Sequence, residues 1–111
     1  RVLNYKLAEV YIRQNRPGLA QPVLNRFLKN NPRDVNAWRL MQQVASLDKK
    51  SPMHTINVLR YRAEVQFWSG FEEEAIKSLL HAQRLAKDNE SMSATIKTRL
   101  TQMQKDRQFR A

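Results

Sequence analysis

The chain has 111 residues, enough for one domain with a core of its own. It contains no cysteine, which excludes disulfides and cysteine-based zinc sites, and its two glycines and four prolines favour helices over sheets. The net charge of +10 makes nucleic acid, anionic lipid or an acidic protein reasonable partners, but charge alone does not choose among them. The chain begins with Arg1 and shows no signal peptide or transmembrane stretch, so we expect a fragment of a longer protein.

Two apolar stripes at helical spacing open the chain. The first comprises Leu3, Leu7, Val10 and Tyr11, and "NRPG" at 15–18 interrupts it. The second comprises Leu19, Ala20, Val23, Leu24, Phe27 and Leu28, and "NNPRD" at 30–34 ends it. Pro22 lies inside the second stripe, which predicts a regular helix that starts near Leu19 or bends at the proline.

The third and fourth predicted helices are separated by "DKKSP" at 48–52. Asp34 is placed to cap the third, whose apolar face comprises Trp38, Met41, Val44 and Ala45. The fourth, from Met53 to Ser69, carries apolar residues on two faces: Ile56, Leu59, Ala63 and Phe67 on one, and Val58, Val65 and Trp68 on the other. Such a helix is expected to be packed on both sides.

Gly70 ends the fourth helix, and "EEE" at 72–74 then places negative charge at the start of a fifth, where the helix dipole favours it. Its apolar face comprises Ala75, Ile76, Leu79, Leu80, Ala82 and Ala86. Ser91 is the predicted cap of a sixth helix with an apolar stripe of Met92, Ile96, Leu100 and Met103. Six helices joined by short breaks indicate an all-α fold of antiparallel pairs.

The opening stretch resembles a tetratricopeptide repeat, a helix-turn-helix unit of roughly 34 residues. The positions that match are Leu7, Ala8, the aromatic Tyr11, the small Ala20 and the closing Pro32. Asn4 stands where an aromatic is usual, and Leu24 and Phe27 exchange the large and small positions. These differences from the repeat pattern still allow the two helices to approach closely at Ala20, because the large side chains around it fill the remaining volume.

Further along, Trp38 and Met41 fit the start of a second unit, and "SGFEEEAIKSLLHA" resembles the turn and second helix of another. The distance from Ala20 to Ala75 is shorter than two repeat periods, so the register slips. We therefore expect a single tetratricopeptide-like α-solenoid over 1–111. Its units would be 1–34, an irregular 35–69, then 70–88, with a closing helix at 91–108.

The order "LNYKLAEVYIRQNRPGLAQPVLNRFLKNNPRDVNAWRLM", then "WSGFEEEAIKSLLHA", then a terminal helix, is similar to the C-terminal repeat domain of BepA-type (YfgC-type) bacterial periplasmic zinc metalloproteases. The resemblance implies a preceding HExxH protease domain, which would hold the zinc, and a periplasmic location. It also implies a role in outer-membrane protein assembly and quality control. The implied partners are β-barrel assembly components, unfolded substrate and the chain's own protease domain.

Residues with catalytic or metal-binding chemistry do not form a recognisable pattern. His54 and His81 have no second ligand at metal spacing, and the three glutamates at 72–74 fan around a helix instead of converging. There is no glycine-rich phosphate loop and no serine–histidine pair at a recognisable spacing. We therefore predict no catalytic, metal or cofactor site in this chain.

The groove-facing positions of the repeat predict a partner-binding surface instead. The first unit contributes Val2, Tyr5, Glu9, Ile12 and Arg13; the second contributes Asn36, Arg39 and Gln43; and the third contributes Asn57, Arg60, Glu64, Phe67 and Trp68. Tyr5, Arg39 and Arg60 are expected to form a row along the groove. For Phe67 and Trp68, the alternative is that they belong to the core. Glu9 stands where repeats that clamp a carboxy-terminal peptide have asparagine, so that clamp is not expected.

The leading hypothesis is a protein-interaction module that binds a partner segment in a concave groove. The alternative is a basic helical repeat that associates with nucleic acid or another anionic partner, with affinity that falls steeply with salt. Against the alternative, Tyr11, Phe27 and Trp38 recur at core spacing and not along a basic stripe.

Overall fold

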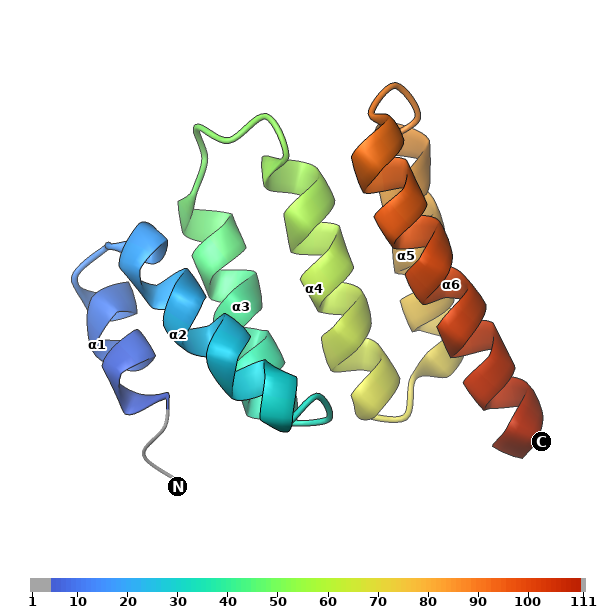
Figure 1. Cartoon of the computed structure of the whole chain (residues 1–111), viewed down its shortest axis with the longest axis horizontal. Helices are drawn as coiled ribbons and strands as arrows, with labels where there is room; N and C mark the ends of the chain where they lie inside the picture. The colour runs from blue at the N-terminus through green and yellow to red at the C-terminus, as the bar shows by residue number, and fades with distance from the viewer. Residues whose placement is uncertain (1–4, 111) are drawn as a thin grey trace.

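Six helices account for about four fifths of residues 5–110, the part of the chain that the computed structural model describes, with side chains described as far as Asp106. They are α1 (Lys6–Arg13), α2 (Pro17–Asn30), α3 (Val35–Leu47), α4 (His54–Trp68), α5 (Glu72–Leu85) and α6 (Glu90–Arg110). Successive helices reverse direction, and α1 and α6 lie at opposite ends of the molecule (Figure 1). Each helix packs against the next along the chain, and α1 also contacts α3. The predicted all-α, tetratricopeptide-like helical repeat is confirmed.

The start of α2 shows how proline is accommodated. The helix begins at Pro17, ahead of the expected start at Leu19, because proline suits the first helical position, where no backbone N–H is needed. It then passes through Pro22 without ending. Proline there removes the hydrogen bond to the carbonyl of Gly18, and Gly18 is exposed, so water can satisfy that carbonyl.

Side chains cap two of the helices. Asp34 accepts a hydrogen bond from the backbone N–H of Ala37 at 3.0 Å, as predicted for α3. The predicted cap of α6 is wrong: Asn89 accepts from the backbone N–H of Met92 at 2.9 Å, and Ser91 already lies inside the helix. Asparagine and serine are equally good caps, so residue type alone could not decide between Asn89 and Ser91.

Buried side chains form two clusters. The first, which we call the N-terminal core, contains residues of α1, α2 and α3, with Leu24 and Met41 as its largest fully buried side chains. The C-terminal core contains residues of α4, α5 and α6, and its largest are Leu79, Ile96 and Met103. Helix α4 supplies Tyr61 to the N-terminal core and four residues to the C-terminal core, so its predicted packing on both sides is confirmed.

Several leucines of the predicted apolar stripes are not buried. Leu7, Leu19 and Leu80 are 50%, 48% and 39% exposed, whereas the adjacent alanines Ala8 and Ala20 are fully buried. Small residues allow helix axes to approach closely, and their contact sets the rotation of each helix. The neighbouring leucines then lie at the edge of the helix–helix contact. Hydrophobic spacing alone did not predict this exposure.

The buried alanines provide a direct test of the helix contacts. Ala20 is 0% exposed in α2, so Ala20→Leu should overpack the N-terminal core and lower the free energy of unfolding by about 1–3 kcal/mol. Ala94→Leu adds the same atoms at an exposed position of α6 and should have little effect. Urea denaturation of both variants measures the difference, and equal midpoints would contradict the close contact at Ala20.

Candidate functional site

A surface hollow of about 480 Å³ lies between α1 and α3, and we call it the α1–α3 groove. Its lining comprises Tyr5, Glu9, Asn36, Arg39, Leu40, Gln42, Gln43 and Val65. Five of the predicted groove residues therefore lie together here: Tyr5, Glu9, Asn36, Arg39 and Gln43. The groove takes its two walls from the first helix of the opening unit and the first helix of the next.

Packing and short-range hydrogen bonds position the polar groups of this groove. The ring of Tyr5 meets Phe27 edge-on, with centroids 5.0 Å apart, which ties it to the N-terminal core. Arg39 donates from Nη1 to Oδ1 of Asn36 at 3.4 Å, a long bond to a neutral group that leaves most of its donors for a ligand. Glu9 lies 3.9 Å from Lys6 in an exposed ion pair of little strength.

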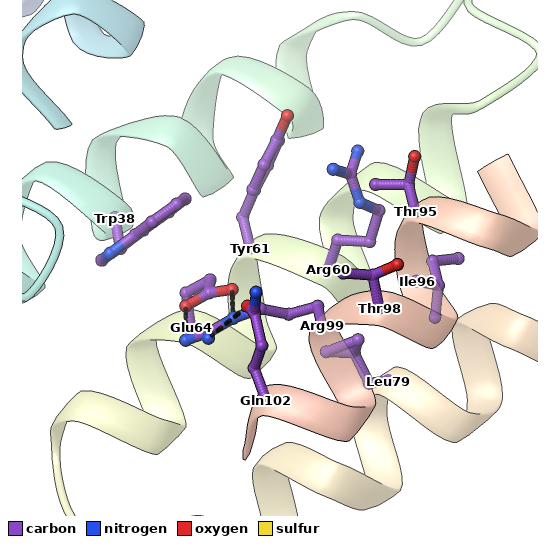
Figure 2. Close-up of a pocket in the computed structure, with 10 residues that line it drawn as sticks. All are labelled: Trp38, Arg60, Tyr61, Glu64, Leu79, Thr95, Ile96, Thr98, Arg99 and Gln102. Atoms are coloured by element: carbon purple, nitrogen blue, oxygen red, sulfur yellow. Dashed lines mark hydrogen bonds and ion pairs between the residues drawn. The ribbon is translucent and has the colours of Figure 1, made fainter. Parts of the chain in front are cut away.

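A second hollow, of about 260 Å³, lies between α4 and α6 and is closed on one side by α3; we call it the α4–α6 pocket (Figure 2). Its lining comprises Trp38, Arg60, Tyr61, Glu64, Leu79, Thr95, Ile96, Thr98, Arg99 and Gln102. Two predicted site residues, Arg60 and Glu64, belong to this pocket and not to the α1–α3 groove.

The lining of the α4–α6 pocket includes an ion pair between α4 and α6 in which the carboxylate is buried. Glu64, whose side chain is 9% exposed, accepts from Arg99 through both oxygens: Nε to Oε2 at 2.7 Å and Nη2 to Oε1 at 2.9 Å. Oε1 also accepts from Nε1 of Trp68 at 3.2 Å. The Arg99 guanidinium lies 5.5 Å from the Phe67 ring centroid, a cation–π contact. The carboxylate is thus fully satisfied by groups of the protein itself.

The remaining predicted residues have other places. Phe67 is 2% exposed in the C-terminal core, and Trp68 packs edge-on against it, with centroids 4.9 Å apart. Ile12 is partly buried against the N-terminal core, and Arg13 is exposed. Asn57 accepts a 2.8 Å hydrogen bond from Arg60, and Val2 lies outside the described residues. The expected row of Tyr5, Arg39 and Arg60 is therefore divided between two hollows.

Sequence reasoning missed Arg99. The residue lies on a helix with a largely polar surface, and its partner Glu64 is far away in the sequence. The available signal was Glu64 itself, a single carboxylate among the apolar residues of a helix packed on both sides, which needs a cation if it is buried.

Among the side chains of 5–106, no three histidine, cysteine or carboxylate groups converge as metal ligands would. None of the helices within 5–110 combines the length and the apolar character that crossing a membrane requires.

Part of the chain is similar to a known protein family. A family model described as tetratricopeptide repeat matches residues 1–44, which include α1, α2 and most of α3. Searches of curated proteins and of solved structures returned no significant match. The family match supports a tetratricopeptide domain, and such repeats generally mediate protein–protein interactions without catalysing reactions. It gives no support to the narrower resemblance to periplasmic metalloproteases.

Proposed function

We propose that this chain is a protein-interaction module that binds an extended segment of a partner protein in the α1–α3 groove. One observation carries the proposal: all the lining residues except Val65 lie within the matched tetratricopeptide segment, and five of the eight are at predicted groove positions. Repeat folds of this kind use such concave surfaces for binding.

The lining of the groove defines what kind of segment fits. At about 480 Å³, the hollow is large enough for several side chains of an extended chain. Gln42 and Gln43 carry amide donors and acceptors that can pair with a partner's backbone. Arg39 can pair bidentately with a carboxylate, while Glu9 disfavours one at its own position. The groove therefore suits a segment with an acidic residue toward Arg39 and a basic or polar one toward Glu9.

Peptides selected from a random displayed library provide the ligand for a test. Arg39→Ala combined with Gln43→Ala should weaken the selected peptides by about tenfold or more, since polar contacts at an interface centre contribute more than 1 kcal/mol. The thermal midpoint should stay nearly unchanged, because both side chains are exposed. Fluorescence anisotropy titrations measure the affinity.

The control variant is Lys77→Ala combined with Arg84→Ala, which removes two exposed cations from α5. If it loses as much affinity as the groove variant, binding is diffuse electrostatics and the groove proposal fails. The net charge of +10 favours nucleic acid as the second candidate. A single-stranded oligonucleotide that binds more tightly than any selected peptide, with a steep loss of affinity in salt, would favour that candidate.

A narrower proposal rests on resemblance alone: the chain would be the C-terminal domain of a periplasmic HExxH zinc metalloprotease that acts in outer-membrane protein assembly. The zinc would then belong to the preceding protease domain. The residues that precede Arg1 in the parent protein decide the matter. A signal peptide followed by HExxH would support the proposal, and a different domain there would contradict it.

A further inference from the structure

We infer that the α4–α6 pocket is a second binding seat, which takes one bulky apolar side chain from an acidic segment of a partner protein. This inference rests on the proposed function, that the chain binds protein segments. It assigns that function an additional site, most of which lies beyond the matched residues 1–44.

The size and walls of the pocket indicate an apolar occupant. Its volume of about 260 Å³ is below the roughly 300–1,000 Å³ of sites that hold drug-sized ligands, so it suits a single side chain. One wall is the stacked pair of Trp38 and Tyr61, whose ring centroids are 6.0 Å apart. Leu79 and Ile96 also line it, and Figure 2 shows the residues of α6 on the side opposite Trp38.

The charge at the pocket indicates an acidic neighbour for that side chain. Glu64 contributes no unpaired negative charge, because Arg99 holds it through two hydrogen bonds. The guanidinium of Arg60 lies 5.3 Å from the Tyr61 ring centroid and donates to neutral Asn57. Within the described part of the chain, no carboxylate forms an ion pair with Arg60. The uncompensated charge beside the pocket is therefore positive, and it complements a carboxylate of the partner.

The walls are also fixed before any ligand arrives. Nε1 of Trp38 donates to the backbone carbonyl of Pro32 at 2.8 Å, which holds the indole in place. Arg99 is held by Glu64 and donates to Gln102 at 3.2 Å. Because few side chains would need to be ordered on binding, the entropy cost of filling the pocket is small.

The test adds three tripeptides with capped ends to the full 111-residue chain. They are Glu-Phe-Glu, Gln-Phe-Gln and Glu-Ala-Glu. Nitrogen-15 NMR reports the site directly, because the two tryptophans give separate indole signals and Trp68 does not line the pocket. Glu-Phe-Glu should shift the Trp38 indole and the amides of 95–102. We expect it to bind about fivefold more tightly than Gln-Phe-Gln, as for an ion pair near a surface. Glu-Ala-Glu should bind at least about tenfold more weakly than Glu-Phe-Glu.

Two variants and a matched control complete the test. Arg60→Gln should abolish the preference for Glu-Phe-Glu over Gln-Phe-Gln, and Thr98→Trp should fill the pocket and abolish the shift at Trp38. Arg62→Gln removes an exposed cation from the same helix and should change neither result. An equal loss in Arg62→Gln, or no shift at Trp38 and 95–102 with any peptide, would overturn the inference. Shifts confined to the α1–α3 groove would overturn the second seat and leave the proposed function standing.

Discussion

Leu79→Ala is expected to lower the free energy of unfolding by about 2–5 kcal/mol, because it removes a buried side chain from the C-terminal core. Leu79 is 1% exposed, on the face of α5 that packs into this core. Removing its side chain loses apolar burial and leaves a cavity that neighbouring helices can close only in part. Urea denaturation followed by far-ultraviolet circular dichroism measures the change.

The next residue is a matched control. Leu80 is 39% exposed, so Leu80→Ala removes the same atoms where water already reaches them and should cost less than about 1 kcal/mol. A similar loss in both variants would mean that α5 is rotated relative to the structure. Because α4 contributes to both cores, we also expect one cooperative transition in each variant instead of separate unfolding of the two ends.

The helices were predictable because their signals are local. Asp34 caps α3 through a residue three positions away, and Gly70 ends α4 with a φ of +96°, a conformation that suits glycine. The local sequence pattern did not determine the rotation of each helix about its own axis. Hydrophobic spacing predicted Leu80 on the apolar face together with Leu79, and only the contact of α5 with its neighbours determined which of the two is buried.

The candidate site was predictable only where the repeat pattern is regular. Five groove positions of the first two repeat units line one hollow, since α1 and α3 keep the spacing of the repeat. Beyond α3 the register slips, and the same transfer of positions placed buried Phe67 in the groove set. The α4–α6 pocket depends on how α6 meets α4, a contact between distant segments that no short motif encodes.

Arg99→Met is expected to lower the free energy of unfolding by about 2–3 kcal/mol, because it leaves the Glu64 carboxylate buried without its cation. This value is below the full cost of breaking a buried pair, since the Arg99 side chain is 26% exposed and water can partly replace it. Glu64→Gln should cost less, because the amide oxygen can still accept from Arg99 and Trp68.

The double variant Glu64→Leu with Arg99→Met separates two contributions to the free energy of unfolding. One is the net contribution of the ion pair, and the other is the cost of leaving one buried charge without its partner. It replaces both charges with apolar groups of similar size, and such replacements are often neutral. We therefore expect the double variant to be more stable than Arg99→Met alone, although it carries one more substitution. Trp68 loses its acceptor in the double variant, which limits the recovery, because its indole N–H is then left without the carboxylate. Denaturation of the wild type, Glu64→Leu, Arg99→Met and the double variant gives the coupling free energy. If the two single losses simply add, Glu64 is solvated well enough to tolerate the loss of Arg99, and the ion pair does not hold α6 against α4.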